Sequence, residues 1–275
     1  MRPSVFMSLP YVHMLMRPKI LIIGYGFVGK TIARSLVNRG YQIAHLDKYD
    51  KFEERHCAEA AIVCVDTPTI EYGKQDVGNV DSALAMLERN MPGSPVMLKS
   101  TVMPEYAALL ASNVTYSPEF IRQGNGYADF EQQEFMLLGA GEFQANHWQR
   151  IFRYLKTEYV QCTPEAAAWC KYMHNTFLAT KVAFFHELDR IADEMHGDGK
   201  LDKSHFFEGL AAIHQFDSTV GGTHLYAPNL DGVYGYGGKC FPKDMEAFAT
   251  WTKSPHLRQI IRHNEKLNGK RPKHS

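Results

Sequence analysis

The sequence lacks an excess of charge of either sign. Its 275 residues carry 30 Lys and Arg against 30 Asp and Glu, so the formal net charge is zero. Such a balance gives no reason to expect a nucleic acid or an anionic membrane as a partner. The sequence also lacks internal repeats and any apolar run long enough to cross a membrane. With 45% hydrophobic and 22% charged residues, it is typical of a globular protein of one large or two ordinary domains.

Cysteine is scarce and forms no recognisable pairing pattern. The five cysteines, at positions 57, 64, 162, 170 and 240, form no C-x-x-C pair, and their odd number argues against a disulfide framework. We therefore expect a reducing, cytoplasmic setting, and no metal site is predicted. Residues 1–16 lack a small-residue cleavage site. They are interpreted as a flexible extension, with Met16 as an alternative start.

A glycine-rich stretch near the C-terminal end carries the strongest chemical signal. Residues 234–244 read YGYGGKCFPKD, with three glycines in four residues just before Lys239 and Cys240. Glycine permits positive φ angles, so a turn can present the cysteine side chain to a ligand. The flanking Lys239 and Lys243 favour the nucleophilic thiolate. The alternative, a small structural cysteine, fits poorly because such a run buries little apolar surface.

A second glycine motif lies near the N-terminal end. A short apolar strand at 19–23 is followed by Gly24-Tyr25-Gly26-Phe27-Val28-Gly29, an amphipathic helix, and a second strand at 42–46 that ends at Asp47. This order and spacing predict a dinucleotide-binding unit. Gly24 makes the turn, Gly26 admits the pyrophosphate, and Gly29 lets helix and strand pack. Phe27 and Val28 open the helix whose N-terminus faces the phosphates. Asp47 would hold the ribose hydroxyls, which favours NAD over NADP, although the adjacent Lys48 weakens that preference.

Further predicted strands each end in polar residues. Strands are predicted at 60–65, 96–99 and 114–116, and helices at 80–89 and 142–155. Thr67 with Pro68, Thr101, and Glu119 follow these three strands in turn. Ligands bind at the carboxyl ends of the strands of an open parallel sheet, so these side chains are expected around one crevice. Taken singly, each also fits a helix cap or a turn.

The remaining chain predicts a helical domain. The fold class is therefore α/β: a Rossmann-type parallel sheet with helices on both faces at 17–160, followed by an all-α domain at 161–275. One long helix is predicted at 164–196, because it starts with Pro164, contains no glycine and stops before Gly197. Lys171 and Asn175 are four residues apart and share one face of it. Taken alone, Lys171 is interpreted as a solvated surface charge. Shorter helices are predicted at 206–216, 246–251 and 256–267, and the tail from 268 is expected to fray.

The run around Cys240 resembles the active-site segment of the UDP-glucose and GDP-mannose dehydrogenase family. Similar patterns occur in order at 24–29, 65–68, 99–102, 117–124 and 171–187. These enzymes oxidise a nucleotide-sugar alcohol to the acid with two hydride transfers to NAD. The resemblance implies a sugar or nucleotide-sugar substrate and a homodimer formed through the long helix.

The same resemblance implies a role for each site residue. Cys240 would attack the intermediate aldehyde, giving a thiohemiacetal and then a thioester. Lys171 and Asn175 would stabilise the oxyanion, which reverses the surface interpretation of Lys171. Thr101 and Asp244 would position a water molecule, and Glu119 would act as the general base in hydrolysis.

Four departures from the family pattern stand out. Gln123 replaces an acidic residue, and Thr219 stands where the family has an arginine that reaches the neighbouring subunit's substrate. Between Asp47 and Ala60 the chain is short, so one strand and one helix of the cofactor domain are expected to be trimmed. The third domain, which grips the nucleotide half of the substrate, is expected to be absent because the chain stops soon after Asn264.

Two alternatives remain open at this point. One is a two-electron dehydrogenase of the hydroxyacid type in which Lys171 does the acid–base work. The other is a degenerate module that binds NAD without turnover. Counting NADH per substrate separates the first alternative from the four-electron reaction, and a substrate screen tests the second.

Overall fold

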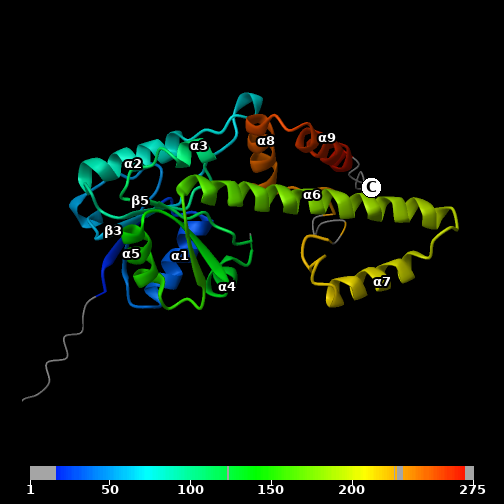
Figure 1. Ribbon diagram of the computed structural model, residues 1–275, viewed down its shortest axis with the longest axis horizontal. Helices are drawn as coiled ribbons and strands as arrows, with labels where there is room; N and C mark the ends of the chain where they lie inside the picture. Colours follow the sequence, from blue (N-terminus) through cyan, green and yellow to red (C-terminus); the bar gives the residue numbers. More distant parts are fainter. Residues whose placement is uncertain (1–16, 123, 226, 228–231, 270–275) are drawn as a thin grey trace, which may run out of the picture.

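The computed structural model describes residues 17–122, 124–225, 227 and 232–269 (Figure 1). The extension predicted at 1–16 and the position of Gln123 lie outside the described residues. The predicted tail begins later than expected, because the last helix continues to Gly269. No helix in these ranges is long and apolar enough to cross a membrane.

The chain begins with the predicted strand–turn–helix–strand unit. Strand β1 (Lys19–Ile23) leads through the glycine turn into α1 (Phe27–Val37), and β2 (Gln42–Leu46) returns beside β1 in parallel. All three elements begin and end within a residue or two of the sequence prediction. The glycine turn therefore lies at the carboxyl edge of the sheet.

Seven strands form one sheet in the order β2-β1-β3-β4-β5-β6-β7. The added strands are β3 (Ala60–Val63), β4 (Val96–Leu98), β5 (Val114–Tyr116), β6 (Phe135–Gly139) and β7 (Glu158–Cys162). The sequence did not predict β6 or β7. Nor is the sheet wholly parallel, since β6 runs antiparallel to β5. Because β7 ends at Cys162, the predicted boundary at residue 160 falls inside the last strand, and Thr163 marks the end of the sheet.

The sheet is buried on both faces, as a largely parallel sheet requires. Leu21 and Ile23 point into one core, and Ile20 and Ile22 into the other. The covering helices are α2 (Gly78–Asn90), α3 (Pro104–Ala107), α4 (Gly126–Glu131) and α5 (Glu142–Phe152), with short 3₁₀ turns η1 (Glu54–His56) and η2 (Glu71–Gly73).

The cofactor domain is trimmed, as the sequence predicted. Only η1 separates β2 from β3, and β2 forms one edge of the sheet. A doubly wound sheet normally carries a further strand beyond this position.

One long helix joins the sheet to the second part of the chain. Helix α6 (Pro164–Gly197) starts where the Thr163 hydroxyl accepts a hydrogen bond from the Ala166 N–H. Its first turns pack on the sheet, because Ala167 and Ala168 belong to the same core as the strands. The rest of α6 extends away from the sheet (Figure 1).

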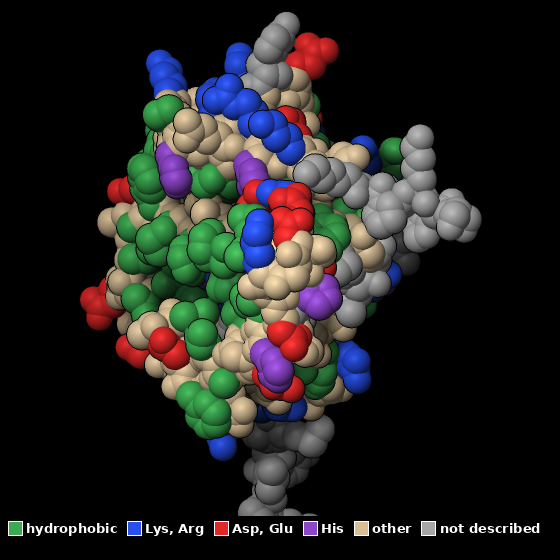
Figure 2. Space-filling model, turned by 90° about the vertical axis from the view of Figure 1, so that its right-hand side faces the viewer, with side chains coloured by type: hydrophobic (Ala, Val, Ile, Leu, Met, Phe, Trp, Pro, Cys, Tyr) green, Lys and Arg blue, Asp and Glu red, His purple; other side chains and the backbone are tan. Residues whose placement is uncertain are grey.

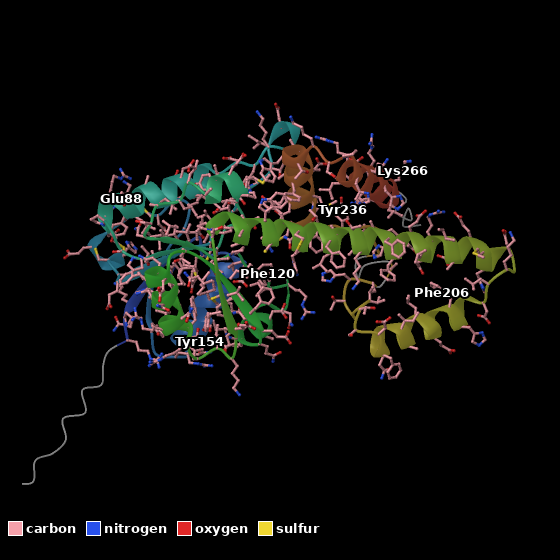
Figure 3. All side chains as sticks on the ribbon, viewed as in Figure 1. Glu88, Phe120, Tyr154, Phe206, Tyr236 and Lys266 are labelled. Carbon is pink, nitrogen blue, oxygen red and sulfur yellow. The ribbon has the colours of Figure 1, made fainter. Side chains whose placement is uncertain are left out.

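Three further helices accompany the outer part of α6. Helices α8 (Phe241–Thr252) and α9 (Pro255–Gly269) lie on one side of it, and α7 (Lys203–Phe216) lies on the other (Figure 1). Tyr236 packs between α6 and the α8–α9 pair (Figure 3). Helix α8 begins five residues before the predicted Glu246, because Cys240 caps it and Pro242 fits its first turn. Cys240 therefore lies at a helix N-terminus, where negative charge is favoured.

Candidate functional site

The glycine turn has the geometry that a dinucleotide requires. Gly24 has φ +88°, and a Cβ there would lie 2.7 Å from the backbone carbon of Cys64. A Cβ on Gly29 would collide with the Gly24 carbonyl oxygen. A Cβ on Gly26 would meet nothing within 4 Å, so this residue faces open space, and no side chain caps α1. The free N–H groups at Phe27 and Val28 can therefore meet a pyrophosphate.

Asp47 lies beside this turn. The Gly24 N–H donates to the Leu46 carbonyl over 2.9 Å, which brings the end of β2 against the glycines. The Asp47 carboxylate is exposed, and among the described residues it accepts only from the Lys48 N–H, so it is available to ribose hydroxyls. These residues fit the dinucleotide that the sequence predicted.

The run from Gly24 to Thr31 also fits the phosphate-loop pattern G-x-x-x-x-G-K-T, which the sequence reading did not weigh. The structure favours the dinucleotide-binding pattern over the phosphate-loop pattern. Helix α1 begins at Phe27, so Lys30 and Thr31 lie inside the helix instead of closing a loop. Lys30 is exposed and Thr31 is buried, so neither can enclose a phosphate within the turn.

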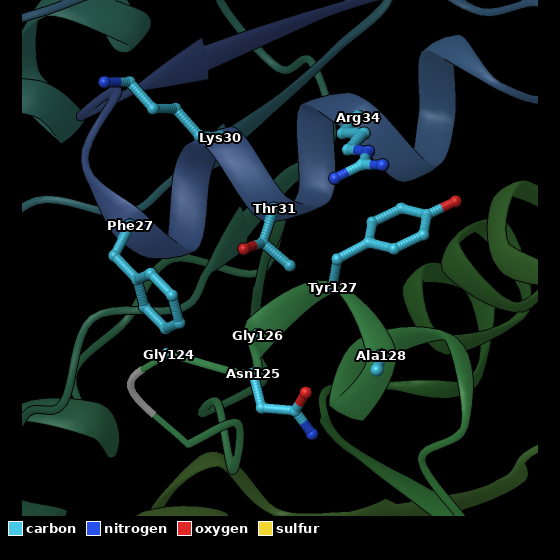
Figure 4. A pocket seen from close by; sticks show the side chains of 9 residues that line it. All are labelled: Phe27, Lys30, Thr31, Arg34, Gly124, Asn125, Gly126, Tyr127 and Ala128. Atoms are coloured by element: carbon cyan, nitrogen blue, oxygen red, sulfur yellow. The ribbon is translucent and has the colours of Figure 1, made fainter.

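A cavity of about 470 Å³ flanks α1. Figure 4 shows Phe27, Thr31 and Arg34 of α1 on one side and Gly126 and Tyr127 on the other. The Arg34 guanidinium lies 4.2 Å from the centre of the Tyr127 ring. The sequence reading missed this hollow, although Lys30 and Arg34 are four residues apart on one helix face.

Thr67 and Thr101 lie at neighbouring strand ends, as predicted. The Thr67 hydroxyl is buried and donates to the Thr101 carbonyl over 2.7 Å. Gln75 donates to the same carbonyl and also to the Tyr172 hydroxyl. Thr67 therefore fixes the backbone at Thr101, and Pro68 follows it partly exposed. The Thr101 hydroxyl has no protein partner in the described part of the chain.

A buried hydrogen-bonded network connects α6 with α8. The Lys171 ammonium donates to the Glu119 backbone oxygen over 2.6 Å and to Asn175 Oδ1 over 3.1 Å. Asn175 Nδ2 donates to Asp244 Oδ2 over 2.6 Å, and Lys243 donates to the other Asp244 oxygen. Lys171, Asn175 and Asp244 are each at most 7% exposed. The structure thus unites four residues predicted from distant parts of the sequence: Glu119, Lys171, Asn175 and Asp244.

Two opposing influences act on the pKa of Lys171. Burial lowers the pKa of its ammonium, while the charges of Asp244, Cys240 and Glu119 act to raise it. The ammonium also lies 4.9 Å from the centre of the Phe120 ring, which sits near the sheet below α6 (Figure 3). The surface interpretation of Lys171 is therefore wrong, because this lysine is buried.

Cys240 lies next to this network at the N-terminus of α8, and its side chain is exposed. The bend before it is held in place by α6 and α9. Gly235 has φ +84° and donates to the His186 ring, while Tyr236 exchanges two backbone hydrogen bonds with the Asn264 side chain. The thiol is thus accessible on a rigid bend. Cys64, near Glu119, is a poor competitor because burial raises the pKa of its thiol to about 12.

The Glu119 carboxylate has a buried partner that the sequence reading did not single out. Lys99, the first residue after β4, places its ammonium 3.1 Å from Glu119 Oε2. The available signal was a lysine at the end of an apolar strand in the same series as Thr67 and Thr101.

Thr219 offers no cation to the site. It is exposed, and its hydroxyl and N–H both donate to Asp217. The nearby Lys181 is engaged by the carbonyl oxygens of Val220 and Gly221.

Comparison with known proteins agrees with this geometry. Residues 165–269 match the central domain of the UDP-glucose/GDP-mannose dehydrogenase family, and residues 50–156 match its NAD binding domain. The chain belongs to this family. The family's NAD binding domain indicates NAD as the cofactor. The glycine turn at residues 24–29 lies outside the matched range.

Among curated relatives, the putative UDP-glucose 6-dehydrogenase YtcA of Bacillus subtilis is 27% identical over 278 residues, covering 83% of this chain and 62% of its own length. The UDP-glucose 6-dehydrogenase of Rickettsia felis is also 27% identical, covering 78% and 48%. The chain thus spans about half to three fifths of the length of these relatives.

Solved structures show the same fold. A UDP-glucose dehydrogenase from Pyrobaculum islandicum superposes with a TM-score of 0.78 at 23% identity, covering 94% of this chain and 70% of that one. The 3-hydroxyisobutyrate dehydrogenase of Mycobacterium tuberculosis gives 0.67 at 16% identity, covering 93% and 95%.

Proposed function

We propose that this protein is an NAD-dependent dehydrogenase that oxidises the primary alcohol of a sugar or nucleotide sugar to the carboxylate, as a UDP-glucose 6-dehydrogenase does. The observation that carries the proposal is the buried Lys171–Asn175–Asp244 network beside the exposed Cys240. NAD, held at the glycine turn, would accept a hydride in each of two oxidations.

The chain's own groups suit a covalent route. The Cys240 thiolate adds to the aldehyde carbon, and the carbonyl oxygen becomes an oxyanion. Lys171 has three N–H donors, of which two bind acceptors among the described residues, so one remains for that oxyanion. Of the two amide N–H groups of Asn175, one donates to Asp244, and the other has no acceptor in the part of the chain that the structure describes. Such preorganised donors lower the barrier most where charge develops.

Release of the acid requires hydrolysis of the thioester. A water molecule attacks the thioester carbon, its proton passes to the Glu119 carboxylate, and the carbon–sulfur bond breaks to return the Cys240 thiolate. The Thr101 hydroxyl, which has no hydrogen-bond partner among the described residues, is available to orient this water. Asp244 accepts hydrogen bonds from Asn175 and Lys243 and so fixes the orientation of the Asn175 amide.

The test measures NADH and acid formation by the full chain with NAD and a panel of sugars and nucleotide sugars. We expect two NADH per acid, and Cys240→Ala should abolish acid formation. Cys170→Ser is the matched control, since Cys170 is also exposed but lies on the second turn of α6. Unchanged acid formation by Cys240→Ala would refute the covalent route.

A second candidate is a two-electron dehydrogenase of the hydroxyacid type. It is favoured by one observation, the lowered pKa of the buried Lys171, which lets this amine exchange its proton at lower pH than an ordinary lysine. One NADH per substrate with no acid from the sugar panel would support it. NAD binding with no NADH from any substrate would support a degenerate binding module instead.

We further propose a homodimer formed through α6 and a cytoplasmic location. Helix α6 exposes a stripe of large hydrophobic side chains along one face: Trp169, Met173, Phe177, Phe184, Ile191 and Met195. Figure 2 views the molecule from its α6–α7 end and shows hydrophobic side chains gathered on one side. A large exposed apolar patch favours association.

The five unpaired thiols support a reducing compartment.

A further inference from the structure

Lys99 is a buried charged residue to which the proposed chemistry assigns no role. It directly follows β4, and its side chain is only 1% exposed. Its ammonium lies 3.1 Å from Glu119 Oε2 and donates to the Ser117 hydroxyl over 3.2 Å. An ammonium buried to this extent is costly unless a carboxylate compensates it. Glu119 supplies that carboxylate.

The Glu119 side chain that pairs with Lys99 is itself buried. This side chain is 8% exposed, and its Oε1 accepts from the Phe120 N–H over 3.0 Å. Its backbone oxygen is held separately by Lys171. Lys99 is the cation that contacts the carboxylate itself. Without a cation, burial would favour the protonated acid, which cannot accept a proton from water.

Other titratable groups around Glu119 do not replace Lys99. They come from three elements packed against it: Cys64 at the end of β3, Lys171 on α6, and, beyond Lys171, Asp244 and Lys243 on α8. The Cys64 thiol is neutral. Lys171 hydrogen-bonds to the Glu119 backbone oxygen and interacts with the carboxylate only through its charge. Lys243 and Asp244 form an ion pair with each other.

We propose that Lys99 is a positioning residue of this site, whose ammonium keeps the buried Glu119 carboxylate ionised and aimed for the hydrolytic step. The inference rests on the proposed function, because it deepens the role of Glu119 as general base. In this role Lys99 acts through Glu119. In the hydrolysis, the proton leaves water for Glu119, and Lys99 keeps its own proton throughout.

The kinetic test compares Lys99→Met with Lys99→Arg. In Lys99→Met, the low-pH limb of the pH–rate profile should move to higher pH by about 1–3 units. An opposite charge at this distance shifts the pKa of a carboxyl by that amount. Lys99→Arg keeps the charge and should keep the limb near its original pH. Lys156→Met removes an exposed lysine between α5 and β7 and should change nothing. A limb that stays in place in Lys99→Met overturns the proposal.

A stability measurement tests the Lys99–Glu119 ion pair independently of activity. If the wild-type chain forms no acid, the proposed function fails, but the ion pair can still be tested. The Lys99→Met variant buries the Glu119 carboxylate without the cation that lies 3.1 Å from it, so the charged form of Glu119 costs folding stability. The stability deficit of this variant against the wild type should therefore widen as pH rises from about 4 to 7. In the double variant Lys99→Met/Glu119→Gln the deficit should no longer depend on pH. A deficit that is flat with pH in the single variant overturns the inference.

Discussion

Two buried lysines contact Glu119. Lys99 faces its carboxylate, and Lys171 donates to its backbone oxygen. Glu119 therefore uses two different groups: its carboxylate pairs with Lys99, and its backbone carbonyl accepts a hydrogen bond from the Lys171 ammonium. Asn175 then continues the chain of hydrogen bonds to Asp244 at the base of α8.

The lowered pKa of Lys171 predicts the alkaline limit of activity. Burial makes this ammonium lose its proton at lower pH than an ordinary lysine, so kcat should fall as pH rises through that lowered value. Folding stability should rise over the same range, because the folded state prefers the neutral amine. Lys171→Arg should lower kcat roughly 10²-fold through misplaced donors. It should also remove the alkaline limb, since a guanidinium stays charged.

The measurement is a pH profile of kcat. Lys181→Arg is the matched control, since burial also lowers the pKa of this lysine three turns further along α6. Its alkaline limb should match that of the wild type. An alkaline limb retained in Lys171→Arg would show that another group titrates.

At this scale the sequence predicted that Lys171 and Asn175 lie side by side, but not that they are buried. The i, i+4 spacing placed Lys171 and Asn175 on one face, and that face does carry the network. Lys99 was missed because its burial arises only when β4 lies between β3 and β5 in the sheet. A lysine's environment depends on such tertiary neighbours, which a local pattern does not contain.

At the scale of elements, we expect a substitution in the glycine turn before α1 to weaken NAD binding without destabilising the fold. Gly26 faces open space and has φ −80°, so Gly26→Val should change the free energy of unfolding by only about 0.5 kcal/mol. The added side chain would block the pyrophosphate, so NAD affinity should fall at least tenfold, which is about 1.4 kcal/mol.

Calorimetric titration with NAD and urea unfolding check this prediction together. Gly141→Val is the control, because Gly141 caps α5 with φ −65° and also faces open space. It should leave NAD affinity unchanged. Equal losses of affinity in both variants would mean that the glycine turn does not bind the pyrophosphate.

Elements with strong local signals were predicted closely, and the others were not. Buried apolar strands such as β1 and β5 match their predicted bounds. Strand β7 was missed because it is an edge strand with exposed polar residues and little apolar pattern. The early start of α8 was missed because the proline and cysteine were interpreted as part of the bend.

At the scale of the whole molecule, α6 unites the two parts of the chain. Its first turns complete a core of the sheet, and Ala179, Val182 and Ala183 pack under the bend that leads to Cys240. The helix thereby fixes the distance between the cofactor edge and the thiol. This arrangement follows from a helix of 34 residues, whose length the sequence predicted to within one residue.

The opposite face of α6 predicts the oligomeric state. Phe177 is 64% exposed at the centre of the apolar stripe, and in a symmetric dimer both copies would bury it. Each copy of Phe177→Asp would lose about 1.5–3 kcal/mol of burial. The dissociation constant should therefore rise by roughly 10²–10⁴-fold. Leu109→Asp, an equally drastic change at a side chain that is 85% exposed outside α6, should leave the mass unchanged. Light scattering after gel filtration distinguishes the outcomes, and a wild-type monomer would contradict a dimer through α6.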